Sequence, residues 1–252
     1  MDTMPITPAL WKMNVAASFS KASAFYETAA FAQTVAADFL EDLIKQHVCG
    51  EGNLLELGVG TGLLTRRLLH QFPGTLVTAV DLSADMLHRL HASLPKEEEH
   101  RVDLRQQDMD LLDEQQKYFL VCSSFALHWS TNPLLLLTRT SRFVTPGGFV
   151  AHALPLRGSL RSLSEAGYLR PIPQISLSMD ELIQYLPQTD IIYAKTHEIV
   201  HTFSNPLSAL QHIKSFGGCC GSPSRKTLLS VRKHPYPISC EWSVGYLIAR
   251  KQ

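Results

Sequence analysis

The stretch "LLELGVGTGLLTRRL", residues 54–68, decides the fold. It places Gly58, Gly60 and Gly62 at alternate positions between a short apolar run and a run with helical spacing. A glycine-rich turn from a strand into a helix exposes backbone N–H groups at the helix N-terminus, where nucleotides bind in α/β proteins. The stretch therefore predicts a nucleotide-binding turn at the edge of a parallel sheet.

Strand-like and helix-like segments alternate on both sides of this turn. Short apolar runs predict strands, and apolar residues at helical spacing predict helices. The predicted strands cover residues 53–58, 74–83, 101–108, 118–127, 149–154, 190–203 and 239–251, and the predicted helices cover 34–46, 62–72, 84–94, 132–144 and 206–216. This order predicts an α/β fold with a parallel sheet covered on both faces.

The regular alternation breaks at Pro155. Residues 155–190 contain four prolines and two short helical patterns, which we interpret as an insertion over one end of the sheet. The whole chain is then one domain. It consists of an N-terminal lid segment (about 1–32), a core (about 33–154), a lid insertion (about 155–190) and a return to the core (about 191–252).

Composition narrows the class of protein. The chain has 252 residues, of which 45% are hydrophobic and 18% charged, as in an ordinary globular protein. No apolar run is long enough to span a bilayer, and the N-terminus lacks the pattern of a secretory signal. Five scattered cysteines fit free thiols in a reducing compartment, and adjacent Cys219 and Cys220 lack zinc-ligand spacing. These observations predict a cytoplasmic protein without a metal.

The zero net charge is unevenly distributed along the chain. Residues 1–118 hold 10 basic and 17 acidic side chains, a net of −7, whereas residues 119–252 hold 13 and 6, a net of +7. A basic half fits an acidic partner, although scatter around a folded surface explains the counts equally well.

The glycine pattern distinguishes between nucleotides. A dinucleotide fingerprint needs a third glycine where this chain has Leu63. Glu56, two residues before the first glycine, would repel a pyrophosphate. A carboxylate there suits a ligand that carries an ammonium and a sulfonium, which describes S-adenosylmethionine.

Two further acids follow successive predicted strands. Asp81 ends the second strand, where a carboxylate accepts hydrogen bonds from ribose hydroxyls, and Asp108 follows the third, within reach of an adenine amine. Each acid alone is typical of an ordinary strand end. Three acids at the carboxyl ends of three successive strands indicate one ligand site.

At this point the sequence resembles the class I S-adenosylmethionine-dependent methyltransferases, through "LLELGVGTG", "VTAVDLS", "RQQDMD" and "VTPGGFV". The resemblance implies a Rossmann-like, seven-stranded, mostly parallel sheet with an antiparallel last strand. It also implies a cofactor site lined by Glu56, Gly58, Gly60, Asp81, Leu82, Asp108 and Met109, with Leu82 packed on the adenine and Met109 offering its backbone amide. We place Ser124 in the same site, the alternative being that it only satisfies nearby backbone groups.

Five other stretches resemble the malonyl-acyl-carrier-protein O-methyltransferases, a family of biotin synthesis. They are residues 16–33, 125–129, 157–166, 207–218 and 236–250. The resemblance implies methylation of the free carboxylate of a malonyl group on acyl carrier protein, giving the ester that primes pimeloyl and biotin synthesis. One departure is Phe119, which stands where many relatives of this class carry an acid; the expected cost is a structural hydrogen bond.

Three residues are candidates for contact with the acceptor. Arg157, beside the turn "RGS", is expected to pair with the acceptor carboxylate, with an ordinary surface arginine as the alternative. Tyr26 is expected to close over the methyl donor and bond the acceptor, or else to be a core aromatic residue. His128, after the fourth strand, is expected to orient the acceptor or to be structural.

Acyl carrier proteins are small and strongly acidic, so a basic second half would steer one onto the site. We predict Lys214, Arg225 and Lys226 as docking residues and a monomeric protein that binds neither nucleic acid nor membrane. Two alternatives stay open: a methyltransferase of another small carboxylate or a quinone precursor, and a catalytically silent methyltransferase-like partner subunit.

Overall fold

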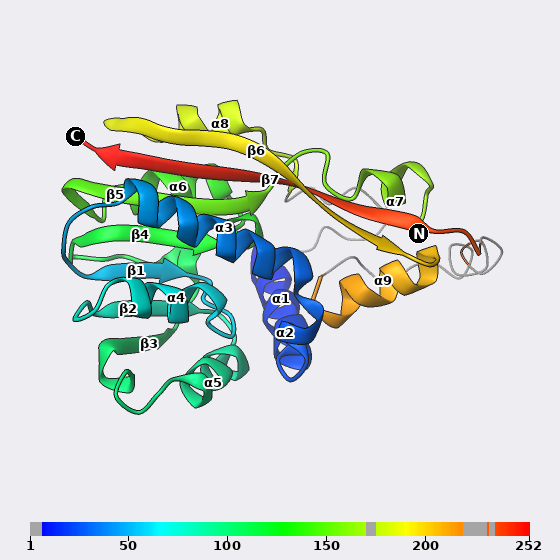
Figure 1. Ribbon diagram of the computed structural model, residues 1–252, viewed down its shortest axis with the longest axis horizontal. Helices are drawn as coiled ribbons and strands as arrows, with labels where there is room; N and C mark the ends of the chain where they lie inside the picture. Colours follow the sequence, from blue (N-terminus) through cyan, green and yellow to red (C-terminus); the bar gives the residue numbers. More distant parts are fainter. Residues whose placement is uncertain (1–6, 170–174, 219–230, 232–234) are drawn as a thin grey trace.

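The computed structural model describes residues 7–169, 175–218, 231 and 235–252 (Figure 1). Its seven strands form one sheet in the order β3-β2-β1-β4-β5-β7-β6. The strands are β1 (Leu54–Leu57), β2 (Val77–Asp81), β3 (Val102–Gln106), β4 (Tyr118–Ser124), β5 (Val144–Pro155), β6 (Thr189–Phe203) and β7 (Ile238–Lys251).

The sheet is parallel except for its last strand in the sequence. Strands β1 to β5 pair in parallel, whereas β7 runs antiparallel between β5 and β6. This arrangement confirms the predicted α/β fold and its antiparallel last strand. The carboxyl ends of β1, β2, β3 and β4 meet at one edge, which is where open α/β sheets bind ligands.

Nine α-helices are described. They are α1 (Pro8–Ala22), α2 (Tyr26–Ala29), α3 (Phe31–His47), α4 (Leu63–Gln71), α5 (Ala84–Ser93), α6 (Pro133–Ser141), α7 (Arg161–Glu165), α8 (Met179–Gln184) and α9 (Pro206–Ser215). Side-chain caps begin several of them: Asn132 accepts from the backbone of Leu135, and Ser178 forms a capping box with Glu181. Such caps satisfy N–H groups that a helix leaves unpaired.

Helices cover both faces of the sheet, and each face has its own core (Figure 1). Helices α3, α4 and α5 pack on one face with residues such as Leu40, Leu68 and Leu90. Helices α6 and α8 pack on the other, with Leu137 and Leu182. Because both faces are buried, β1 is apolar throughout except for Glu56, whose burial therefore needs a separate explanation.

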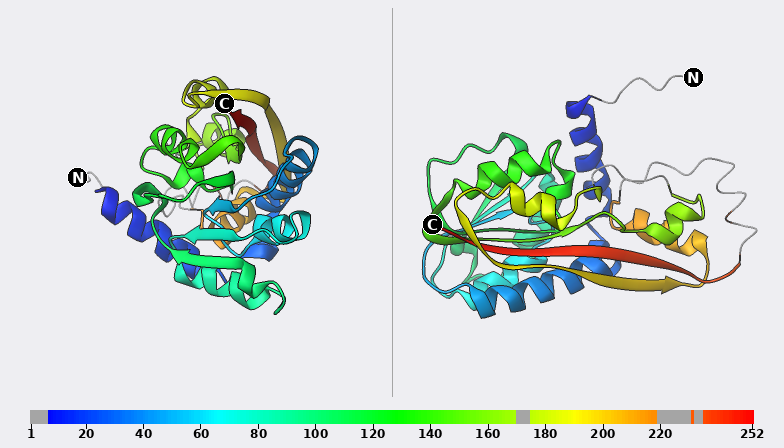
Figure 2. Two further views of the ribbon diagram at one scale, coloured as in Figure 1. Left: turned by 90° about the vertical axis from the view of Figure 1, so that its left-hand side faces the viewer. Right: turned by 90° about the horizontal axis from the view of Figure 1, so that it is seen from above.

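The two strands β6 and β7 extend beyond the rest of the sheet, where α7 and α9 lie beside them (Figure 2). Helices α1 and α2 lie at the carboxyl edge of the shorter strands (Figure 1). The N-terminal helices, the extended hairpin and α9 therefore surround the end of the sheet at which the ligand site is expected.

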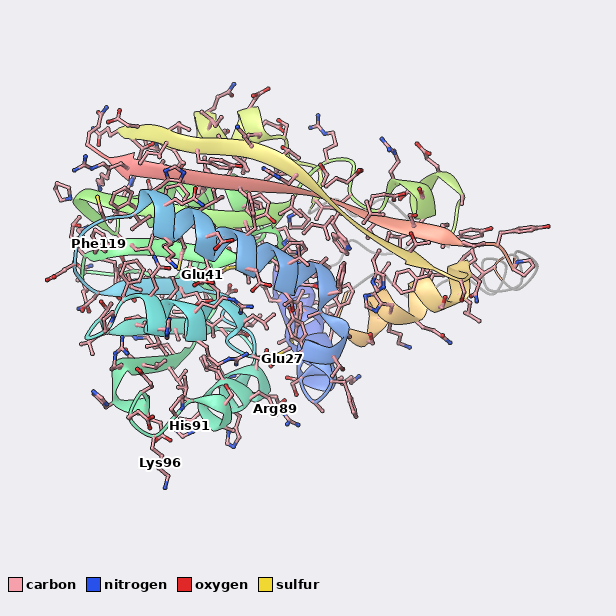
Figure 3. The ribbon with its side chains drawn as sticks, viewed as in Figure 1. Glu27, Glu41, Arg89, His91, Lys96 and Phe119 are labelled. Carbon is pink, nitrogen blue, oxygen red and sulfur yellow. The ribbon has the colours of Figure 1, made fainter. Side chains whose placement is uncertain are left out.

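Phe119 lies toward the opposite end of β4, away from α1 and α2 (Figure 3). Its ring is buried and packs edge-on against Phe72 and Phe149. An added Cβ at Gly50 or Gly52 would meet the Phe119 side chain at 2.6 Å. An apolar contact thus occupies the position at which the sequence resemblance led us to expect an acid.

Candidate active site

The glycine turn after β1 adopts a backbone that side chains disfavour. Gly58 and Gly60 both have positive φ, 67° and 55°. A Cβ on Gly58 would lie 2.3 Å from the Ala126 Cβ, so the turn also needs glycine for space. A Cβ on Gly60 would meet nothing within 4 Å, because this glycine borders a cavity.

This first cavity lies over the carboxyl ends of β1, β2 and β4 and holds about 870 Å³, part of it open to solvent. It brings together the eight residues predicted to bind the cofactor: Glu56, Gly58, Gly60, Asp81, Leu82, Asp108, Met109 and Ser124. The cavity thus has acids and glycines on one side and apolar groups such as Met86 and Phe125 on the other.

Glu56 is buried at the floor of the cavity. Its Oε2 accepts a hydrogen bond from the Thr65 hydroxyl at 2.7 Å. Burial raises the Glu56 pKa from about 4.5 to about 8, with the nearby Asp81 charge adding to the effect. A carboxyl group with this pKa is largely protonated at pH 7, and a cationic ligand group beside Glu56 would favour its ionised form.

Asp81 ends β2 and holds the glycine turn in place. Its Oδ2 accepts from the Gly60 N–H and its Oδ1 from the Ser83 N–H, both at 2.8 Å. Burial raises its pKa although these hydrogen bonds lower it. Each oxygen keeps a second lone pair, which leaves capacity for two hydroxyl donors.

Asp108 is joined to the N-terminal helix by a lysine. The Lys12 Nζ lies 2.8 Å from the Asp108 Oδ1 and 2.8 Å from the Asp110 Oδ2, and the Lys12 residue is only 8% exposed. Asp110 also accepts from Ser130 and Thr131. Burial raises the Asp110 pKa, but the bonds from Lys12 and Ser130 outweigh it, so the pKa lies below its usual range.

Further contacts fix α1 and α2 over the first cavity. Trp11 stacks on Trp129 with ring centroids 5.9 Å apart, and the Ser20 and Ser83 hydroxyls lie 2.9 Å apart. Glu27 of α2, labelled in Figure 3, forms an ion pair with Arg66 of α4 at 2.9 Å. Aromatic packing, a hydrogen bond and ion pairs therefore all hold the N-terminal helices against the sheet edge.

A second cavity of about 440 Å³ adjoins the first. The two cavities share five lining residues: Phe19, Tyr26, Gln33, Phe125 and Trp129. The second cavity is completed by His128, Ile175, Ile213, Phe216, Gly218 and Trp242. Its described wall is therefore mostly aromatic and apolar, with Tyr26, Gln33 and His128 as its polar side chains, and the shared residues mark the place where the two cavities join.

Tyr26 and His128, which we predicted to contact the acceptor, both line this second cavity. Tyr26 begins α2, and burial together with the Asp81 charge raises the pKa of its phenol. His128 lies in the 3-10 turn η3 (Leu127–Trp129), and burial lowers its pKa to about 3. Both side chains are therefore uncharged at neutral pH, and the His128 Nδ1 has no partner among the described residues.

Arg157 lines neither cavity, so the structure does not bring this predicted residue to the site. Its side chain is 66% exposed. The guanidinium bonds to the Ser176 carbonyl at 2.8 Å and to the Glu181 carboxylate at 3.3 Å, which ties the turn after β5 to the start of α8. The arginine holds one surface segment to another.

The predicted docking residues are only partly described. Lys214 is exposed near the end of α9, whose Ile213 lines the second cavity. Arg225 and Lys226 lie outside the described residues, as do Cys219 and Cys220. No described helix is long and apolar enough to cross a membrane.

Lys12 and Gln33 line the cavities but were not among the site residues predicted from the sequence. Both are polar residues on the buried faces of their helices: Lys12 shares its face with Val15, and Gln33 shares its face with Ala37 and Leu40. A polar residue that interrupts an apolar helical stripe is the signal that identifies such residues from sequence. Thr65, which bonds Glu56, carried no comparable signal.

Proteins of known family resemble this chain in sequence. A family model described as a methyltransferase domain matches residues 54–148, from β1 into β5. A curated relative from Ilyobacter polytropus, named malonyl-[acyl-carrier protein] O-methyltransferase 2, is 27% identical over 219 residues, covering 82% of this chain and 80% of the relative. A biotin biosynthesis bifunctional protein from Bordetella avium is 32% identical over 162 residues, covering 64% of this chain and 34% of that longer protein.

Solved structures share the fold at lower identity. The plantazolicin methyltransferase BpumL, solved in complex with SAH, superposes with a TM-score of 0.55 at 15% identity and covers 97% of this chain and 98% of its own. The superposition shows that the two chains share a fold.

Proposed function

The chain is a class I S-adenosylmethionine-dependent methyltransferase, and from that premise we propose that its acceptor is the free carboxylate of a malonyl group on acyl carrier protein. The methyl ester formed would prime pimeloyl and biotin synthesis. The observation that supports the proposal is the chemistry of the junction between the two cavities: the five residues that line both cavities include no carboxylate, histidine or amine.

The residues that line the first cavity suit the chemical groups of S-adenosylmethionine. We assign the Glu56 carboxylate to the cofactor's ammonium and the two Asp81 oxygens to the ribose hydroxyls. The open space at Gly60 allows the backbone to approach the ligand closely. Asp108 and Met109 are assigned to the adenine edge, where the start of the 3-10 turn η2 (Met109–Leu111) leaves backbone N–H groups without a helical partner.

When bound, S-adenosylmethionine supplies an electrophilic methyl group on a sulfonium. The residues of the chain then have to hold a nucleophile in line with that methyl and keep water away. The aromatic side chains at the junction, Phe19, Phe125 and Trp129, exclude water from the space between the two ligands.

The lack of a base among the described residues at the junction favours one kind of acceptor. A hydroxyl or an ammonium must lose a proton before it attacks, whereas a carboxylate is already ionised at pH 7. His128, with a pKa of about 3, is too weak a base to deprotonate either of the first two. An acceptor carboxylate therefore suits the described junction, and the name of the relative from Ilyobacter polytropus points to the same chemistry.

Charge supports delivery of the acceptor on an acidic carrier. The second cavity borders α9, and Lys214 near the end of that helix is exposed. We propose that Lys214 contacts the carrier protein while the acyl group enters the second cavity. Such a contact would act mainly on the association rate and would weaken with salt.

An acceptor panel tests the proposal. The protein is incubated with S-adenosylmethionine and, in separate reactions, malonyl-acyl carrier protein, acetyl-acyl carrier protein, free malonate and a hydroxylated quinone precursor, and formation of S-adenosylhomocysteine is followed. We expect product with the malonyl carrier and none with the acetyl carrier, which lacks the carboxylate. Faster turnover of free malonate or of the quinone precursor would replace the proposed substrate.

A further inference from the structure

Gln33 is a buried glutamine whose side-chain oxygen has no hydrogen-bond partner among the described residues. It lies on α3, only 6% exposed, and its Oε1 has no partner. Native proteins rarely leave a buried amide unsatisfied, because the lost hydrogen bonds with water are not replaced. The amide therefore needs either a ligand or a structural reason for its position.

The place of Gln33 favours a ligand. It is one of the five residues that line both cavities, and the other four are the aromatic residues Phe19, Tyr26, Phe125 and Trp129. Among these five, Gln33 is the one with an amide, which supplies two N–H donors. Rotation of the amide about its last torsion presents either end to the same space.

We propose that Gln33 binds the carboxylate of the acceptor at the junction of the two cavities, with the Tyr26 hydroxyl as a second donor. The proposal rests on the proposed function for the identity of the acceptor, but its chemistry applies to any carboxylate that meets the methyl donor there. Neutral donors hold and orient the carboxylate without the strong ion pair that a lysine or arginine would form. The attacking oxygen therefore keeps its electron density for the transfer.

The local structure explains why such a residue is tolerated. Helix α3 begins at Phe31, so Gln33 lies in its first turn, directly after α2 and Tyr26. The buried neighbours on the same helix, Ala36 and Ala37, are small and leave room beside the amide. A methionine has nearly the same length and better satisfies an apolar site, so stability alone would favour it over glutamine here.

The test compares Gln33→Met and Gln33→Glu with a control, Gln71→Met. Gln71 also has an unpaired buried Oε1, but it ends α4 and lines neither cavity. Binding of malonyl-pantetheine to the S-adenosylhomocysteine-saturated protein is measured by calorimetry, together with cofactor affinity and the melting temperature. Turnover of malonyl-acyl carrier protein is measured separately.

We expect Gln33→Met to weaken malonyl-pantetheine binding by roughly 10- to 100-fold, the effect of losing hydrogen bonds to a charged group. Gln33→Glu should weaken it at least as much through repulsion. The cofactor affinity of Gln33→Met should remain near that of the wild type. Its melting temperature should be no lower than that of the wild type, whereas loss of a structural glutamine would lower it. The control should behave as wild type in every measurement.

Three results would overturn the inference: no malonyl-pantetheine binding by the wild type, unchanged binding by Gln33→Met, or an equal loss of cofactor affinity, which would assign the amide to the methyl donor. Gln33-dependent binding without turnover of malonyl-acyl carrier protein would instead contradict the proposed function and leave the carboxylate site in place.

Discussion

Lys12 and Asp108 form an ion pair, with the lysine Nζ 2.8 Å from the Asp108 Oδ1, that joins the N-terminal helix to the end of β3. The same Nζ contacts Asp110 at 2.8 Å, so one buried ammonium serves two carboxylates. Lys12 and Asp108 line the cavity in which we propose that the cofactor binds. The position of α1 is therefore linked to the acids at the end of the cavity where we propose that the adenine binds.

Replacement of Lys12 should loosen this closure. Lys12→Met leaves the Asp108 and Asp110 carboxylates without their shared cation, and we expect roughly 1–3 kcal/mol of lost stability, the usual cost of an unpaired buried polar group. Hydrogen exchange of the α1 amides and the cofactor dissociation rate should both increase. Lys21→Met, an exposed lysine on the same helix, is the control. Equal exchange in the two variants would show that the aromatic contacts alone hold α1.

Asp81 should contribute to cofactor affinity. Asp81→Ala removes the acceptors assigned to the ribose hydroxyls and should weaken binding by roughly 1–3 kcal/mol in calorimetry. Asp85→Ala, an exposed acid in the first turn of α5, should leave affinity unchanged. Unchanged affinity in Asp81→Ala would remove Asp81 from the ligand site and leave it the role of bonding Gly60.

Glu56 makes cofactor binding dependent on pH. Its pKa is about 8 in the empty protein because of burial, so Glu56 is largely protonated at pH 7. An ammonium bound beside it favours the carboxylate, so binding releases a proton and affinity should rise as pH increases toward 8. Calorimetry at pH 7 in buffers of different ionisation enthalpy should detect this proton. Glu56→Gln should abolish its release, and a wild type that releases none would contradict the assignment.

The same shift affects stability in the opposite sense. The folded-state pKa of Glu56 is raised above its ordinary value of 4.5, so the folded protein binds this proton more tightly than the unfolded chain. The resulting stability is present below about pH 4.5 and is lost as pH rises to about 8. Without cofactor, the melting temperature of Glu56→Gln should therefore rise relative to that of the wild type as pH increases from about 4.5 to about 8. If the melting temperatures of the two proteins change equally with pH, Glu56 has an ordinary pKa in the folded protein.

Arg157 should matter less to turnover than its position in the sequence predicts. Its guanidinium is exposed and bonded to Ser176 and Glu181. We expect Arg157→Gln to retain kcat/KM for the malonyl substrate within about twofold, because exposed ion pairs contribute little. Glu181→Gln, which removes the partner, should have a similarly small effect. A large loss in Arg157→Gln alone would restore the arginine to the acceptor site.

The features that the sequence predicts well are those that depend on neighbouring residues along the chain. The turn from Gly58 to Gly62 and the acids Glu56, Asp81 and Asp108 lie next to strand ends, so strand order alone places them at one edge. The acceptor side depends on packing between segments far apart in sequence. Gln33 and Trp242 line the same cavity because of tertiary packing, which the periodicity of the sequence does not predict. The placement of Arg157 outside both cavities also depends on a distant contact, because its partner Glu181 lies on another segment.

The most direct test of the central claim is the mass of malonyl-acyl carrier protein after incubation with this protein and S-adenosylmethionine. We expect a gain of one methyl group on the malonyl carrier and none on an acetyl carrier treated identically. An unchanged malonyl carrier, under conditions in which calorimetry shows the cofactor bound, would contradict that claim.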